Sequence, residues 1–565
     1  MNTQPAKGRR ALAPLGALAL IFVLSLIGPM RGLATVFAQD AASTPTAVGG
    51  VVIEAQERAR VSDPTGKQEL RLAGTIIDPV PLDPAVARDV NSAFMTRQVY
   101  RGLTRFDENL EPVPELAQRI EISGDGLTYR FLLSDNARFA DGSPVTAQDV
   151  VYSLTRALNP ETAAEADAAL AGPSYLADIA GADALIQGET NALAGVQALD
   201  ERTVEITLEG PRATFLMKLA SAPAAIVDPD DVARGGEWWR NPNASGPFVV
   251  ESWEPEEELR LAGNKQYVGG EPDLKRIVFR LGPSAANPFN LYQADEIDVA
   301  TVPIPAIDRV SDPESPVLEE LDVSPILSTT YIAFRNDVAP MDNPEIRRAV
   351  LLAFPRWKVA EILLSGRQET AHGLIPPGTL GRDWPDVAPE QDLEAARAAI
   401  ASSTYGSAEN VPPIRIYGAG PFGSEALRDV LEDELGLTVE VLDVHWPQFN
   451  QGLAQQTFPA YELTWVADFP DPETFLWNLF ATGSPDNYSA YSNPDFDALL
   501  AEAAATLDVD ARAELYAAAE ATLVADNVLL PLSHDVRYTL MKPWVKGLDV
   551  TPLGTLYLET AWLEH

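Results

Sequence analysis

The chain has 565 residues, of which 22% are charged and 46% apolar, proportions typical of a folded protein of several domains. Its 82 acidic and 41 basic residues give a formal net charge of −41, which repels phosphate backbones and argues against nucleic-acid binding. The absence of cysteine excludes disulfides, thiolate nucleophiles, iron–sulfur clusters and a lipid-modified N-terminal cysteine.

The first 38 residues have the pattern of an export signal. A basic segment, residues 7–10, precedes an apolar stretch at 11–27, and Val-Phe-Ala follows at 36–38. The apolar stretch is at the short limit of a membrane-spanning helix, so residues 1–38 are predicted to be a signal peptide or, alternatively, an uncleaved anchor. Residues 39–60 are expected to form a flexible linker. The protein is therefore predicted to be exported, to a periplasm or to the cell surface.

Short strand-like segments then alternate with amphipathic helices. Residues 127–133 and 203–208 have the composition of strands. Helices are predicted where a capping residue is followed by an acid or a proline, which occurs at Thr146 with Asp149, at Asn343 with Pro344, and at Asn493 with Pro494. The alternation predicts an α/β fold, and no fixed-period repeat indicates a solenoid or a propeller.

A Gly-x-Gly-x-x-Gly motif occupies residues 418–423, between a predicted strand and a predicted helix. Asp443 lies in the next predicted strand, so the pattern matches a dinucleotide-binding fingerprint. No second nucleotide-binding half is visible, and export separates the protein from cytosolic nucleotides. We therefore expect the glycines to serve turn geometry, with no cofactor bound.

The sequence offers little for catalysis or metal binding. It lacks the phosphate-binding loop and the nucleophile elbow of hydrolases. The carboxylate pair Asp468 and Asp471 could be imagined as a glycosidase acid and base, but surface charge is the simpler explanation in so acidic a chain. Four histidines occur far apart and predict no metal site: His372, His445, His534 and His565.

One aromatic segment is a better candidate for binding. A predicted strand from Tyr461 ends near Trp465, and two prolines, at positions 470 and 472, break the chain soon after Asp468. An aromatic ring beside a carboxylate suits an amino-terminated or cationic ligand. The alternative is a core tryptophan with a turn-capping aspartate, and this segment alone does not separate the two readings.

A series of segments resembles, in order, the extracytoplasmic solute-binding proteins of ABC transporters, family 5, which includes oligopeptide, dipeptide and nickel binders. The segment at 124–158 is similar to the most diagnostic signature of that family. The other segments are residues 82–107, 245–253, 294–300, 331–336, 344–354 and 491–503.

The resemblance implies a periplasmic-binding-protein-like (Venus-flytrap) fold of two α/β lobes joined by two crossovers. On this chain the crossovers are expected near residues 329–336 and 530–537. The expected domains are lobe I at 61–332, with an inserted subdomain at about 106–224, lobe II at 333–532, and a C-terminal return to lobe I at 533–565.

The resemblance also implies site residues. In peptide binders of this family the acid at the position of Asp468 holds the α-ammonium of the ligand, and the tryptophan at the position of Trp465 lines the pocket. Arg415, in a predicted strand, and Trp477, at the end of the aromatic segment, complete the candidate ligand-binding set. The loop at 418–423 lacks the arginine that dipeptide binders carry there, which disfavours a dipeptide specialist.

We therefore predict a monomeric binding protein, not an enzyme, that captures a peptide-like solute and delivers it to the permease subunits of an ABC importer. The first alternative is the same fold with a non-peptide solute such as a metal chelate, a sugar or another small organic molecule. A sensing role and, less favoured, a secreted hydrolase also remain as alternatives.

Overall fold

The computed structural model describes residues 50–56, 62–74, 81–88, 90–364 and 367–565. The predicted signal or anchor, residues 1–38, lies outside this part of the chain. Among the described residues, no helix combines the length and the apolar character needed to cross a membrane.

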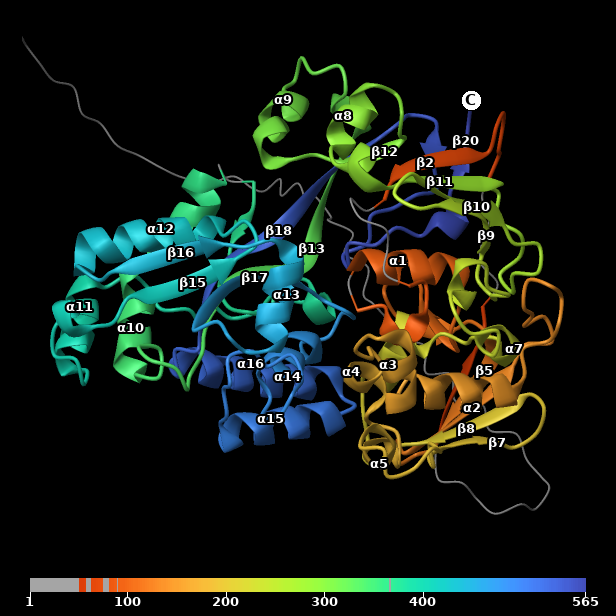
Figure 1. Ribbon diagram of the computed structural model, residues 1–565, viewed down its shortest axis with the longest axis horizontal. Coiled ribbons are helices and arrows are strands. Elements are labelled where there is room, and N and C mark those ends of the chain that lie inside the picture. The colour runs from red at the N-terminus through yellow and green to blue at the C-terminus, as the bar shows by residue number, and fades with distance from the viewer. Residues whose placement is uncertain (1–49, 57–61, 75–80, 89, 365–366) are drawn as a thin grey trace, which may run out of the picture. The chain divides into compact units, whose positions relative to one another are not determined.

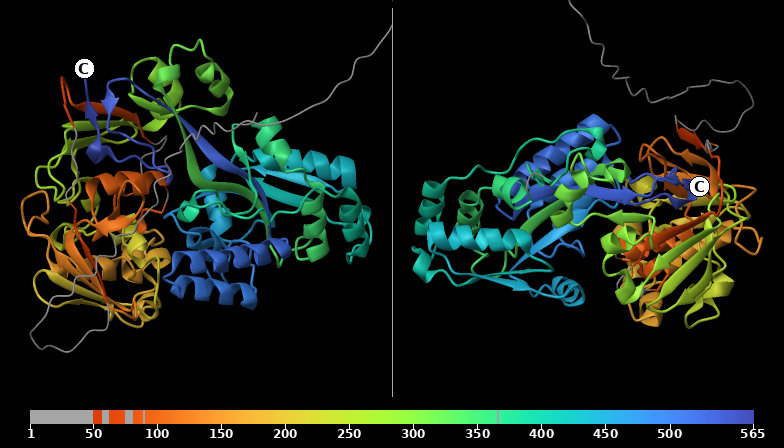
Figure 2. Two further views of the ribbon diagram at one scale, coloured as in Figure 1. Left: turned by 180° about the vertical axis from the view of Figure 1, so that it is seen from behind. Right: turned by 90° about the horizontal axis from the view of Figure 1, so that it is seen from above.

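The largest element is an eleven-stranded sheet. Its strands, in spatial order, are β16 (Val439–Asp443), β15 (Ile414–Gly418), β17 (Ala460–Val466), β13 (Leu321–Phe334), β18 (Leu529–Met541), β12 (Val299–Thr301), β2 (Glu69–Ala73), β11 (Arg276–Arg280), β10 (Glu258–Gly263) and β9 (Phe248–Glu254), with β14 (Glu369–Thr370) paired to β18. The long antiparallel strands β13 and β18 run between two groups of elements in Figures 1 and 2. They divide the molecule into a first lobe, built on β2 and β9–β12, and a second lobe, built on β15–β17.

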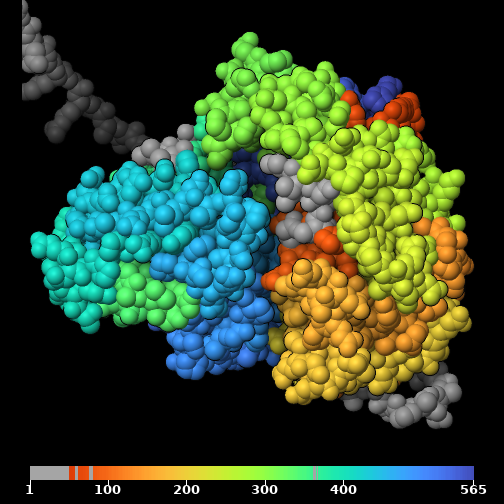
Figure 3. Space-filling view, viewed as in Figure 1, coloured from red at the N-terminus to blue at the C-terminus, as the bar shows by residue number. Residues whose placement is uncertain are grey.

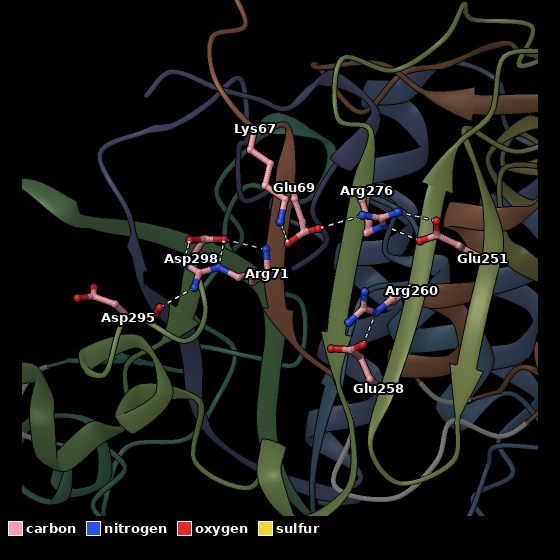
Figure 4. A network of polar contacts seen from close by, with 9 residues as sticks. All are labelled: Lys67, Glu69, Arg71, Glu251, Glu258, Arg260, Arg276, Asp295 and Asp298. Atoms are coloured by element: carbon pink, nitrogen blue, oxygen red, sulfur yellow. Dashed lines mark hydrogen bonds and ion pairs between the residues drawn. The ribbon is translucent and has the colours of Figure 1, made fainter.

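In the first lobe, β2 pairs in parallel with both β11 and β12. Leu70 and Ile277 are fully buried in its core. The sheet also carries the ion pairs drawn in Figure 4, in which Arg71 contacts both carboxylate oxygens of Asp298 through Nε and Nη2. Its helices are α1 (Val90–Val99), α7 (Pro229–Val232), α8 (Pro288–Gln293) and α9 (Ile307–Ser311), and the short strands β19 (Val545–Lys546) and β20 (Trp562–Leu563) pair with each other.

A separate five-stranded antiparallel sheet forms the small-sheet subdomain. Its strand order is β1 (Val51–Glu54), β5 (Ala117–Ile122), β6 (Thr128–Leu133), β8 (Thr203–Thr207) and β7 (Val196–Ala198). The short strands β3 (Thr104–Phe106) and β4 (Pro112–Pro114) pair beside it. The helices here are α2 (Ala147–Arg156), α3 (Pro160–Ala166), α4 (Pro173–Leu176), α5 (Ala182–Ile186) and α6 (Phe215–Lys218).

The strand β1 corrects the expectation of a flexible linker over residues 39–60. Residues 51–54 pair with β5 in antiparallel register, Val51 opposite Ile122 and Glu54 opposite Arg119. The β-branched sequence Val-Val-Ile suits an edge strand, and β5 offers it an unpaired edge. Part of the segment read as a tether is therefore built into the fold.

In the second lobe, β15 lies between β16 and β17 and is parallel to both. Its helices are α10 (Pro344–Ala353), α11 (Leu393–Ser402), α12 (Phe422–Val430), α13 (Trp446–Ala454), α14 (Glu473–Phe480), α15 (Pro494–Ala505) and α16 (Val509–Ala525). An apolar core of Ile414, Ile416 and Leu427 lies between β15 and α12.

The local signals in the sequence act as predicted. Thr146 and Asp149 form a complete capping box at the start of α2. Asn343 and Asn493 cap α10 and α15, each with proline at the beginning of the helix. The two-lobed α/β fold is confirmed, and the boundaries expected at 332/333 and 532/533 fall inside β13 and β18.

Candidate functional site

A cavity of about 610 Å³ lies between the lobes. Figure 3 shows the surface indented where the second lobe, in cyan and blue, meets the first lobe and the small-sheet subdomain. The first lobe contributes residues at and before the start of α1, the subdomain contributes α4, and the second lobe contributes α13, β17 and the segment that follows β17. The cavity residues used below are Arg88, Tyr175, Trp446, Leu463, Thr464, Trp465, Val466, Asp468, Asn478, Asp486 and Tyr488.

Asp468 lies in the wall of this cavity, where three groups hydrogen-bond its carboxylate. The Tyr175 hydroxyl donates to Oδ1 at 2.8 Å, from the small-sheet subdomain. Thr474 Oγ1 and Asn478 Nδ2, both in α14, donate to Oδ2 at 3.1 and 3.3 Å. A carboxylate accepts about four hydrogen bonds. Oδ1 therefore retains acceptor capacity toward a ligand.

The chain turns sharply between β17 and α14, and this turn positions Asp468. β17 ends at Val466, and Pro470 and Pro472 lie in the turn that follows, where proline prevents a return to strand pairing. Asp471 then accepts from the backbone N–H of Glu473 at 3.0 Å and pairs with Arg512 Nε at 3.0 Å. Asp471 is fully buried and does not line the cavity. Asp468 and Asp471 therefore do not face each other across the cavity as a catalytic acid and base would.

The environment of Asp468 disfavours its charged form when no ligand is bound. Burial raises the pKa of Asp468 to about 6, and the nearby carboxylate of Asp486 adds to this rise. The hydrogen bonds from Tyr175, Thr474 and Asn478 act in the opposite direction without overcoming burial. A positive group placed against Oδ1 would remove this penalty, because an opposite charge favours the ionised carboxylate.

Aromatic side chains form the remaining walls near Asp468. Trp465 and Tyr488 are partly buried and line the cavity, and Trp446 lines it with 49% of its surface exposed. These rings provide apolar area beside a polar anchor, the composition typical of sites for small organic ligands.

A second contact joins the lobes at the cavity. Arg88 of the first lobe lies 3.3 Å from Asp486 of the second lobe, measured from Nη2 to Oδ1. The Tyr488 hydroxyl donates to the same Oδ1 atom at 2.8 Å. Two polar contacts at the cavity, Arg88 with Asp486 and Tyr175 with Asp468, therefore connect the second lobe to the first lobe and to the small-sheet subdomain.

A buried ionic network lies outside the cavity but joins the same two parts of the molecule. Lys218 of α6 contacts Glu473 of α14 at 2.5 Å and Asp178 at 2.8 Å. Thr214 Oγ1 donates to Glu473 Oε2 at 2.6 Å. Burial alone would lower the pKa of Lys218, but the two carboxylates outweigh burial and raise it. Charge pairing in this network thus contributes to closure between the subdomain and the second lobe.

The structure brings together two of the four predicted site residues. Asp468 and Trp465 both line the cavity. Trp477, in α14, instead packs beneath the guanidinium of Arg212, whose Cζ lies 4.8 Å from the ring centroid. Arg415 is exposed on β15 and pairs with Glu440 at 2.7 Å. Neither is among the residues that line the cavity.

The glycine motif is a structural turn. Gly420 donates its backbone N–H to Asp443 Oδ1 at 2.9 Å, so the aspartate considered for a ribose hydroxyl closes the turn instead. Gly420 has φ of 78°, a left-handed conformation that glycine adopts readily. Within the described residues, no group of three or more acidic or histidine side chains is placed to hold a metal ion.

Sequence reasoning missed the partners that the other parts of the chain supply. Two of these residues, Tyr175 and Arg88, are hundreds of positions away from Asp468 in the sequence. The third, Asp486, is close to Asp468 in the sequence but belongs to no recognisable motif. Nothing in their local sequence marks them as functional. A tertiary contact alone identifies them.

The family of the chain follows from comparison with known proteins. The model described as "Bacterial extracellular solute-binding proteins, family 5 Middle" matches residues 111–487, more than half of the chain. The chain belongs to this family. Its members are binding proteins for solutes, and the two-lobed fold with a cavity between the lobes agrees with that activity.

Curated relatives in this family differ in their named ligands. The periplasmic oligopeptide-binding protein OppA of Salmonella typhimurium is 28% identical over 498 residues, which cover 85% of this chain and 90% of that protein. The probable deoxycholate-binding periplasmic protein YgiS of Escherichia coli is 28% identical over 501 residues, covering 86% of this chain and 92% of that protein.

A solved structure supports the same fold. The murein tripeptide binding protein MppA of Escherichia coli has a TM-score of 0.76 and 27% identity, and the match covers 89% of this chain and all of that chain. The unliganded open form of MppA gives a TM-score of 0.67 over 89% of this chain and 98% of that chain. The chain therefore resembles the open form less than it resembles the other MppA structure.

Proposed function

We propose that this family 5 protein captures a peptide-like solute with a free amino group between its lobes and delivers it to the permease of an ABC importer. The observation that carries the proposal is the position of Asp468. Asp468 lines a cavity between the lobes together with Trp465, and its Oδ1 atom accepts a hydrogen bond from the Tyr175 hydroxyl.

The chemistry of the cavity fits such a solute. An α-ammonium group donates charge-assisted hydrogen bonds to a carboxylate, and its charge favours the ionised form of Asp468. The volume of about 610 Å³ lies within the range of about 300–1,000 Å³ found for small-ligand sites. The names of OppA and MppA, which refer to oligopeptides and a murein tripeptide, support a peptide.

A second candidate is a non-peptide organic acid of low polarity. The name of YgiS refers to deoxycholate, and YgiS is as similar in sequence to this chain as OppA is. An anionic ligand of that kind gains nothing from the carboxylate of Asp468. The two candidates therefore differ in whether binding depends on Asp468.

We further propose that the protein acts outside the cytoplasm, as the names of periplasmic relatives support. Residues 1–38 would supply the export signal or an anchor. The proposed role includes no bond cleavage, and a monomer is sufficient for it, because both walls of the cavity come from one chain.

The test is isothermal titration calorimetry with tetra-alanine and with N-acetyl-tetra-alanine. We expect the free amine to bind at least about tenfold more tightly, since a buried charge pair contributes a few kcal/mol. Asp468→Asn should remove this preference, while the surface control Asp429→Asn should keep it. Equal affinity for the two peptides in the wild-type protein would exclude the proposed role of Asp468.

The Asp468→Asn variant is expected to fold. A carboxyl whose pKa is raised in the folded protein contributes stability below its unfolded pKa of about 3.8, and this contribution is lost as the pH rises through about 6. At pH 7.5 the buried charge of Asp468 is unfavourable, so asparagine should be tolerated. Deoxycholate, titrated in parallel, tests the second candidate directly.

A further inference from the structure

A second cavity, of about 540 Å³, adjoins the first. Thr464 and Val466 of β17 line both cavities, so a ligand can extend from one into the other. Residues of β13, β17 and β18 form one side of the second cavity. The polar and charged ones among them are Ser328, Thr330, Thr464, Ser533, Asp535 and Arg537.

The walls of the second cavity are mostly apolar. Ile304 of the first lobe and Phe422 of the second lobe are exposed by 38% and 46%, although both are large apolar side chains. Val302, Ile307 and Leu532 continue the apolar lining. Such walls suit an apolar side chain of a ligand, which would cover Ile304 and Phe422 and exclude water from them.

The helix N-terminus at this cavity is already occupied. Glu462 accepts hydrogen bonds from the backbone N–H groups of Gly423 and Ser424 at 2.9 and 2.6 Å, and from the Ser424 hydroxyl at 2.6 Å. These N–H groups lie at the start of α12, where a ligand carboxylate would otherwise bind. A carboxylate entering the second cavity must therefore find a different partner.

Arg537 is a positively charged residue that lines this cavity. It is partly buried, and its Nη1 atom donates to the carbonyl oxygen of Gly554 at 2.5 Å. Among the described residues, no carboxylate forms an ion pair with its guanidinium, and Asp535 accepts a hydrogen bond from Ser328 Oγ at 2.8 Å. Burial lowers the pKa of Arg537, partly offset by the charge of Asp535. The remaining guanidinium N–H groups can bind a carboxylate.

The strand register gives the spacing between Arg537 and Asp468. β13 places Ser328 opposite Val466, and it places Ser324 opposite Arg537 on its other side. Asp468 follows β17 and Arg537 lies on β18, on opposite sides of β13, and the register of β13 with β18 shifts between Pro325 and Thr329. Two inter-strand spacings of about 4.8 Å put their Cα atoms roughly 10 Å or more apart. An extended peptide of about four residues covers such a distance.

We propose that Arg537 binds the C-terminal carboxylate of a short peptide whose amino group is held at Asp468 and whose last, apolar side chain fills the second cavity. This inference rests on the proposed function and adds the length and the C-terminal chemistry of the solute. Arg537 is a specificity-determining residue in this arrangement, and Ile304 and Phe422 select the apolar side chain.

The test is calorimetry with Ala-Ala-Ala-Phe and its C-terminal amide. We expect the amide to bind the wild-type protein about tenfold or more weakly, because it cannot form the charge-assisted pair with Arg537. Arg537→Gln should weaken binding of the peptide acid to a similar degree and leave the affinity for the peptide amide unchanged. The matched control Arg415→Gln, an arginine outside both cavities, should preserve the difference between acid and amide.

Two further ligands test the other parts of the inference. Ala-Ala-Ala-Ser should bind more weakly than Ala-Ala-Ala-Phe, and six-residue peptides should bind more weakly than four-residue peptides. Equal affinity of acid and amide in the wild-type protein would overturn the role of Arg537 without requiring any variant to fold. Failure of every peptide to bind would overturn the proposed function itself, and the inference with it.

Discussion

The hydroxyl of Tyr175 donates a 2.8 Å hydrogen bond to Oδ1 of Asp468, although the two residues are 293 positions apart in the chain. Tyr175 belongs to the small-sheet subdomain and Asp468 to the second lobe. The group proposed to hold the solute therefore also holds the lobes together. Ligand binding and lobe closure share one carboxylate.

We expect Tyr175→Phe to weaken peptide binding about tenfold. The hydrogen bond to a charged group contributes about 1.5–3 kcal/mol, and it forms only when the subdomain meets the second lobe. Calorimetry measures the affinity, and small-angle X-ray scattering measures the dimensions of the ligand-free protein, which should increase as closure is weakened. Tyr405→Phe, a partly buried tyrosine of the second lobe outside the cavity, is the control. Unchanged affinity in Tyr175→Phe would show that the bond has no part in closure.

Peptide affinity should fall with decreasing pH. The pKa of Asp468 is raised to about 6 in the ligand-free protein, while an ammonium ligand requires the ionised carboxylate. At pH 5 about one tenth of the carboxyl groups are ionised, so the dissociation constant should rise about tenfold relative to pH 7.5. The charged neighbours Arg88 and Asp486 line the same cavity, and no histidine is among its lining residues. Asp468→Asn should abolish the dependence, whereas a dependence that persists in this variant would assign it to another group.

Lys218→Met should weaken closure of the lobes without unfolding the protein. The substitution leaves Glu473 without its buried cation and Asp178 with Arg212 as its remaining ion-pair partner. An unpaired buried charge of this kind destabilises the buried arrangement by about 3–5 kcal/mol. Opening of the lobes would return Glu473 to water, so we expect a large loss of peptide affinity with a small change in the melting temperature. The exposed control Lys67→Met removes a surface pair with Glu69 and should change neither. A large fall in melting temperature with unchanged affinity would mean that the network persists in the open state.

Asp298→Asn should destabilise the first lobe. The carboxylate accepts from the backbone N–H of Arg71 at 2.7 Å and from Arg71 Nη2 at 2.6 Å, and it is almost fully buried. An amide in its place presents one N–H₂ group to the guanidinium, at an expected loss of about 3 kcal/mol. Urea denaturation followed by circular dichroism should give a lower midpoint.

The matched control for this change lies on the same sheet (Figure 4). Glu258 pairs with Arg260 at the surface, where an ion pair contributes less than about 1 kcal/mol. Glu258→Gln should therefore leave the midpoint within error of the wild-type value. Equal effects of the two substitutions would contradict the importance of burial for the Arg71–Asp298 pair.

The sequence by itself determined features that depend on neighbouring residues. The capping box at Thr146 and the Asn-Pro starts at 343–344 and 493–494 specify helices through contacts within one turn, so a linear pattern is sufficient. Alternation of strands and helices gave the α/β class, and the order of family-like segments indicated the two lobes. Asp468 and Trp465 were identified because they lie close together in the sequence, at and just beyond the end of β17, and match positions of the ligand site in the family that the chain resembles.

Only the tertiary structure decided which side chains meet at the site. The partners of Asp468 and Asp486 across the cavity, Tyr175 and Arg88, come from elements distant in sequence, and no local pattern encodes such a contact. Arg415 lies on the exposed face of β15, where it pairs with Glu440. Arg537, on the crossover strand β18, instead lines a cavity. The physical reason is that a strand fixes which residues share a face, whereas the packing of two lobes fixes which face borders the ligand.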